Sequence, residues 1–245
     1  VLTKGGVFDV TAHNSFAQLL PAFALSMVAV GLAAPAAMSS GTVIVAISLV
    51  ASTFFGIAAI LYAVIATTTA FSSMLHYGTA REAGPTLMVI VPILTVLGIM
   101  FLRQNHGLHT TFDAHGAAAE TMVFLARLLT IQVVFLLLGM LVLRRQGYFE
   151  DFVFGSKTSP GSYALVCPGV ALSVMLHFFI NKGLVASGVI AKFGAAYWSF
   201  TALALIAQAL MILLVFRLNR QHFSASGNLL AAASQSGEVS LFDVA

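Results

Sequence analysis

Side chains that could bind a metal ion are few in this sequence: seven histidines, eight carboxylates and one cysteine. The densest group is His106, His109, Asp113 and His115, which falls between two long hydrophobic runs and therefore in a predicted loop. A zinc site needs three or four ligands that converge with fixed geometry, and proximity along a loop does not provide that. We expect an ordered polar loop here and no metal.

A haem could be held only by two histidines on facing helices. His177 lies near the end of one hydrophobic run and His76 near the end of another, and the predicted topology puts them at opposite membrane faces. The single cysteine, Cys167, excludes an internal disulfide and any multi-cysteine metal site. We expect no cofactor and no enzymatic activity.

Arg127 is the only ionisable residue well inside a hydrophobic run. A charge at the bilayer centre costs about 2.5–3.5 kcal/mol on insertion scales. At about 1.5 Å per residue, Arg127 lies roughly 10 Å from the helix start near Glu120, within snorkelling reach of the interface. Two interpretations stay open: a structural residue that snorkels, or a cation that attracts anions to a pathway.

Three prolines recur at nearly equal intervals, each inside a hydrophobic run: Pro21, Pro92 and Pro168. Proline removes a backbone donor and clashes with the preceding helical turn. In a bilayer the freed carbonyl must find a partner in protein or in a water-filled cavity. We therefore expect three kinked helices that face inward and line a pore.

A hydroxyl side chain follows each of these prolines within five residues: Ser26, Thr95 and Ser173. Each hydroxyl could face the pore, where it would contact a passing ion. It could instead bond back to a carbonyl of its own helix, as serine and threonine often do. Both interpretations stay open for each residue.

The composition places the chain in a membrane. Of its 245 residues, 60% are hydrophobic and 8% are charged, whereas a soluble domain carries about 25% charged residues. The pI is near 9.3, but Lys and Arg lie at the ends of the hydrophobic runs rather than in a cluster. We expect the lipid bilayer, and no nucleic acid, as a partner.

Spanning about 30 Å of hydrocarbon takes about 20 helical residues, and six runs qualify. The sequence predicts an all-α integral membrane protein of three repeated helical hairpins, in which proline-bearing and proline-free helices alternate. Residues 1–13 form a polar N-terminal segment, 14–220 the transmembrane domain and 221–245 a loose polar tail. The chain starts without methionine, and we expect it to be part of a longer polypeptide. The predicted spans are 15–34, 42–71, 85–102, 120–143, 160–180 and 195–218.

Six spans put both termini on one side of the membrane. Seven basic residues then share that side and three lie on the other. The positive-inside rule favours cytoplasmic termini, in the inner membrane of a bacterium. The seven are Lys4, Arg81, Arg144, Arg145, Lys157, Arg217 and Arg220, and the three are Arg103, Lys182 and Lys192.

Three segments carry a family resemblance: SFAQLLPA at 15–22, GPTLMVIVP at 84–92 and GSYALVCPG at 161–169. At these residues the chain resembles the tellurite-resistance/dicarboxylate transporter family, which includes the plant slow anion channels. The resemblance implies ten transmembrane helices in five hairpins, an inner ring of five helices around a pore, and a homotrimer. This chain would be the last three hairpins, with its first, third and fifth spans as inner helices.

The resemblance also implies a gate, and here the chain departs from the family. Members commonly place an aromatic residue before the proline of the last inner helix, whereas Cys167 occupies that position in this sequence. A thiol is far smaller than a benzyl group, so the gate would be another residue such as Leu165 or Phe23. The predicted pore-lining residues are Pro21, Ser26, Pro92, Thr95, Leu165, Cys167, Pro168 and Ser173.

The leading functional hypothesis is a transporter or channel for small anions. The candidate cargoes are a C4-dicarboxylate, an oxyanion such as tellurite or sulfite, and a halide, and no charged binding motif chooses among them. A pore with few fixed cations suits this function, because a buried Lys or Arg would hold an anion and slow its exit. The alternatives are a redox subunit that binds haem or quinone, and an assembly subunit that transports nothing.

Overall fold

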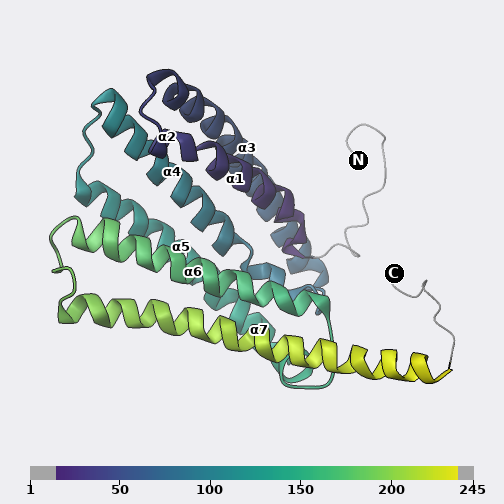
Figure 1. The fold of residues 1–245 in the computed structure, drawn as a ribbon. Coiled ribbons are helices and arrows are strands. Elements are labelled where there is room, and N and C mark those ends of the chain that lie inside the picture. Colours follow the sequence, from purple (N-terminus) through teal and green to yellow (C-terminus); the bar gives the residue numbers. More distant parts are fainter. Residues whose placement is uncertain (1–14, 237–245) are drawn as a thin grey trace, which may run out of the picture.

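The computed structural model describes residues 15–236, with side chains to Phe223, and this part of the chain contains helices but no strand. Six helical spans are long and apolar enough to cross a membrane (Figure 1). The prediction of an all-α chain with six helices long and apolar enough to span a membrane is therefore confirmed for the described residues. The spans are Phe16–Met38, Thr42–Tyr77, Gly84–Phe112, Ala118–Arg145, Pro160–Val185 and Ala195–Phe223.

Several spans are composed of more than one helical segment. The first contains a 3₁₀ turn, Phe16–Leu19, followed by α1, Leu20–Leu32, and α2, Ala34–Met38. The second is α3, Thr42–Tyr77. The third contains a 3₁₀ turn, Gly84–Met88, and α4, Ile90–Phe112, and the fourth is α5, Ala118–Arg145.

A π-helical turn, Phe149–Val153, lies in the connection from α5 to the fifth span. The fifth span contains a 3₁₀ turn, Pro160–Leu165, then α6, Val166–Phe178, and a π-helical segment, Phe179–Val185. The sixth helix, α7, runs over Ala195–Ser236. It thus continues well past residue 218, where the apolar run was expected to end, and includes residues 221–236 of the predicted loose tail.

The third span is longer than predicted, and this corrects the placement of two histidines. Its apolar run was expected to end at Leu102, but α4 continues to Phe112 and ends where Asp113 adopts a left-handed conformation with φ 54°. His106 and His109 therefore lie on the helix rather than in a loop. The extension packs against its neighbours through two buried residues, Gln104 and Gly107, whereas its histidines are exposed.

The three prolines of the predicted kinks all lie at helix starts. Pro21 is the second residue of α1, and Pro92 and Pro168 are the third residues of α4 and α6. Proline suits the first helical turn, where its missing N–H would have no intrahelical partner. A 3₁₀ turn precedes each of them. At Pro21 the carbonyl that the missing N–H would leave free is that of Ala17, and it accepts the Leu20 N–H instead.

Helix α4 occupies the middle of the bundle (Figure 1). It packs against α1, α2 and α3 and also against α5 and α6, while α1 packs on α3 and α6 on α7. In the third span, 56% of the most apolar window is buried, against 11% in the sixth. The helix with Pro92 therefore contacts both other proline-bearing helices and forms the centre of the fold.

The loops 78–83 and 146–159 meet at one end of the bundle. Arg81 Nη2 lies 2.7 Å from a carboxylate oxygen of Asp151, and the Gln146 amide donates to the Thr79 carbonyl at 3.3 Å. Helix α7 joins them through Gln221, which donates to the Lys157 carbonyl at 2.8 Å. Six of the seven basic residues predicted to share one membrane side belong to the segments at this end, and Lys4 lies outside the described residues.

Candidate functional site

A buried polar network lies where α4, α5 and α6 meet, close to Pro92. The Thr95 hydroxyl is 3.1 Å from the Val91 carbonyl of its own helix and 3.1 Å from the Ala171 carbonyl of α6. The Gln132 amide of α5 donates to the Val91 carbonyl at 3.0 Å and to the Thr95 hydroxyl at 2.7 Å. Gln132 is 0% exposed and Thr95 4%. The network thus links three spans through buried polar atoms.

The network is not fully satisfied. The oxygen of the amide, Gln132 Oε1, is buried and has no hydrogen-bond partner among the residues that the structure describes. A buried acceptor without a partner costs about 1–3 kcal/mol. Residues with such costs are retained where they serve function or specificity. The network is therefore the most distinctive polar feature in the interior of the spans.

The two serines predicted near the other prolines are also buried, but they bond differently. Ser173 on α6 donates to the Ala204 carbonyl of α7 at 2.8 Å, so its hydroxyl points to a neighbouring helix. Ser26 on α1 donates to the Phe23 carbonyl of its own helix at 2.7 Å. Thr95 thus lies at the α4–α6 contact and Ser173 at the α6–α7 contact, and Ser26 belongs to a separate part of the fold.

A second polar cluster fixes the far part of α4 and was not predicted. The Gln104 amide donates to the hydroxyls of Ser52 and Thr53 on α3 at 2.8 and 3.0 Å. Arg103 Nη1 donates to the Val30 carbonyl of α1 at 2.7 Å. The sequence signal for both clusters is a glutamine in or beside an apolar run, because buried amides in membrane helices need partners on neighbouring helices.

The residues predicted to line the narrow part of a pathway lie in different surroundings. Cys167 and Pro21 are exposed, whereas Pro168 and Pro92 are buried. Leu165 is 6% exposed and packs in a cluster with Met88 and Tyr148. Phe23, the other candidate gate, is half-buried against the α1–α3 core. Of the residues predicted to line the pathway, Cys167 and Pro21 alone thus have exposed side chains.

Arg127 and the histidines lie outside this region. Arg127 is exposed on α5, on the face opposite to the buried Leu125 and Leu129. His109 and His115 have ring centroids 6.2 Å apart, and both residues are exposed. Within residues 15–223 no group of three or more His, Cys, Asp or Glu side chains is placed to hold a metal ion.

The possible haem ligands each bond to their own helix. His177 Nδ1 is 2.8 Å from the Ser173 carbonyl and His76 Nδ1 is 2.8 Å from the Ser72 carbonyl. The histidines therefore lie on α6 and α3, each held by the turn that precedes it. No paired arrangement of the two was predicted from the sequence.

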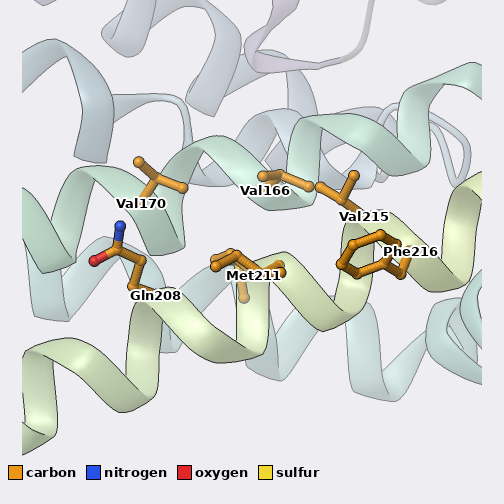
Figure 2. A pocket seen from close by; sticks show the side chains of 7 residues that line it. Val166, Val170, Gln208, Met211, Val215 and Phe216 are labelled. Atoms are coloured by element: carbon orange, nitrogen blue, oxygen red, sulfur yellow. The ribbon is translucent and has the colours of Figure 1, made fainter.

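A shallow apolar groove lies between α6 and α7. Figure 2 shows Val166 and Val170 of α6 facing Met211, Val215 and Phe216 of α7, with Gln208 near one end. Its cavity volume is about 250 Å³. Gly169 lets the two helices approach, because a Cβ at this position would overlap the Met211 side chain. The groove is apolar, and Gln208 is the one polar side chain among the residues that line it.

Comparison with known proteins adds no relative: no family model, no curated protein and no solved structure matches this chain. The interpretation of the site therefore depends on its own residues.

Thr95→Val should lower the free energy of unfolding by about 0.6–1.7 kcal/mol, the range for hydrogen bonds between membrane helices. Valine keeps the shape but removes the hydroxyl that joins α4, α5 and α6. The measurement is reversible unfolding in mixed detergent micelles. Thr130→Val is the matched control, since Thr130 is exposed and its hydroxyl bonds only within α5, to Ala126. Equal losses in the two variants would contradict a special role for Thr95.

Proposed function

We propose that this chain forms part of a membrane pathway for small anions, as a channel or a proton-linked transporter. The observation that carries the proposal is the common start of three spans, each with a 3₁₀ turn followed by an α-helix that has proline at its second or third residue. Three copies of one local structure are expected where three helices hold equivalent positions around a shared axis.

The burial of the spans supports the same arrangement. The proline-bearing spans have 33%, 56% and 33% of their apolar windows buried, and the other three have 28%, 22% and 11%. Helices α1, α4 and α6 would then form an inner arc of three helical hairpins, with α3, α5 and α7 toward the lipid. The exposed faces of α1 and α6, marked by Pro21 and Cys167, would face the pathway. A trimeric assembly follows from the family resemblance alone.

The chemistry of this surface suits a mobile anion. The hydroxyls that follow the prolines, of Ser26, Thr95 and Ser173, are buried and bonded to carbonyls of the chain. Arg103 on α4 is likewise engaged by a carbonyl of α1, so none of these groups would hold an ion tightly. Weak polar contacts permit both entry and release, whereas a bare cation would retain the ion. Arg127 lies on the exposed face of α5 and would act as a snorkelling residue in this arrangement.

The basic end of the bundle would be cytoplasmic, in a bacterial inner membrane, by the positive-inside rule. In a Cys167→Ser background, Thr110→Cys should react with an impermeant thiol reagent in intact cells, and Thr158→Cys should react only after lysis. Both threonines are exposed. The opposite labelling pattern would place the basic end outside the cell. Reaction at both sites in intact cells would contradict the placement of Thr110 and Thr158 on opposite sides of the membrane.

Isotope uptake into proteoliposomes tests the function. Succinate, sulfite or tellurite, and chloride represent the three cargo classes, and protein-free liposomes give the background. We expect uptake of at least one class above background and a size-dependent order among them. A Soret band in the purified protein, with background uptake of all three, would favour a haem subunit instead.

A further inference from the structure

A large groove separates α5 from α7 at the basic end of the molecule. Its cavity volume is about 1050 Å³, just above the range of about 300–1,000 Å³ found for ligand sites. Each wall begins with a leucine and ends with an arginine: Leu137 to Arg144 on α5, and Leu210 to Arg217 on α7. At about 1.5 Å per residue, each wall is roughly 10 Å long. The groove is thus apolar along its length and charged at one end.

The charged end of the groove contains two arginines, Arg144 and Arg217. Arg217 donates from Nε to the Val153 carbonyl at 3.1 Å and from Nη2 to the Phe154 carbonyl at 3.0 Å, which fixes its guanidinium at the mouth of the groove. A guanidinium has five N–H donors, so others stay available to a ligand. Arg144 is exposed at the opposite wall. The residues that line the groove include two arginines and a single carboxylate, that of Glu150.

The position of the groove selects a lipid over a soluble anion. Its walls include Leu137 and Leu213, which are 62% and 64% exposed on the outer surface of membrane-spanning helices. Arg144 is the last residue but one of α5, at the depth where an apolar span meets the headgroup layer. A soluble anion would leave the apolar walls without a partner, whereas an acyl chain would cover them.

We propose that this groove binds one anionic phospholipid, with its phosphate between Arg144 and Arg217 and an acyl chain along the walls. Basic pockets between transmembrane helices recognise anionic headgroups in this way, and arginine pairs with phosphate oxygens bidentately. The glycerol hydroxyls of phosphatidylglycerol would donate to Glu150. The site is independent of the proposed anion pathway, because it lies between two helices placed outside that pathway.

Native mass spectrometry of the purified full chain, titrated with phosphatidylglycerol or phosphatidylcholine, tests the proposal. One anionic lipid should bind at least about fivefold more tightly than the zwitterionic one, the contribution expected of one arginine near the membrane surface. Arg144→Gln should abolish this preference, and Arg144→Lys should keep most of it. Arg145→Gln is the matched control, because it removes the same charge one residue away from the groove lining and should leave the preference intact.

A second variant tests the acyl-chain part of the groove. Leu141→Trp, on the α5 wall, should weaken binding of both lipids without changing the preference, and its melting temperature serves as the control for folding. Equal loss in Arg144→Gln and Arg145→Gln, or no preference in the native protein, would overturn the proposal. So would a change of oligomeric state in Leu141→Trp with lipid binding unchanged, since the groove would then be a contact between copies of this chain.

Discussion

Gly107→Ala should lower the free energy of unfolding by about 1–3 kcal/mol, the cost of overpacking a close contact. Gly107 is buried near the end of α4, and a Cβ built there would overlap the carbonyl group of Ala36 on α2. That carbonyl is backbone, so no side-chain rotation can relieve the overlap. The helices must separate, and the bonds of Gln104 to Ser52 and Thr53 would lengthen with them. Gly107→Leu should prevent folding.

Gly31→Ala is the matched control for this effect. Gly31 also lies in a helix, but a Cβ there would meet nothing within 4 Å. Alanine is favoured over glycine in a helix by about 1 kcal/mol, so this variant should be neutral or more stable. The comparison uses melting temperatures of the purified proteins in one detergent. An unchanged melting temperature for Gly107→Ala would show that α2 and α4 are farther apart than the structure has them.

Cys167→Phe should reduce anion flux at least about tenfold, which corresponds to a barrier higher by about 1.4 kcal/mol. In the proposed arrangement Cys167 faces the pathway one residue before Pro168, and a benzyl group there would narrow it. Cys167→Ala should leave flux unchanged or raise it. Because Cys167 is exposed in the single chain, the larger side chain meets open space there rather than a packed contact.

Because Cys167 is exposed, a loss of flux in Cys167→Phe can be distinguished from a folding defect. A cysteine buried as a small hydrophobe at a helix contact would make Cys167→Phe overpack and destabilise the protein. Here the yield and melting temperature of Cys167→Phe should match those of the native protein. Native flux per correctly folded molecule in Cys167→Phe would remove this residue from the pathway.

The number and type of the spans could be predicted from the sequence because run length and apolarity report directly on the membrane. Helix ends were less predictable. The third span was expected to end at Leu102 because the sequence turns polar there, yet α4 continues to Phe112. Its polar residues are stabilised by partners distant in sequence, such as Ser52 and Thr53 for Gln104. Apolar periodicity contains no information about such partners.

The polar interior was predictable only in part. Thr95 was singled out because it follows Pro92, and it does lie in a buried network. Gln132, which completes that network, was not singled out, although an amide inside a long apolar run signals a buried polar contact; its partners on α4 could not be read from its position. The bonding of Ser26 to its own helix and of Ser173 to α7 depends on how the helices are rotated against each other. Packing decides that rotation, and the local sequence does not.

Uptake measured before and after modification of Cys167 tests the anion pathway most directly. This is the only cysteine in the sequence, so a small anionic methanethiosulfonate labels one defined site. We predict anion uptake above that of protein-free liposomes, a fall on labelling, recovery with a reducing agent, and no response in Cys167→Ser. Uptake equal to that of protein-free liposomes for dicarboxylate, oxyanion and halide alike would contradict the account.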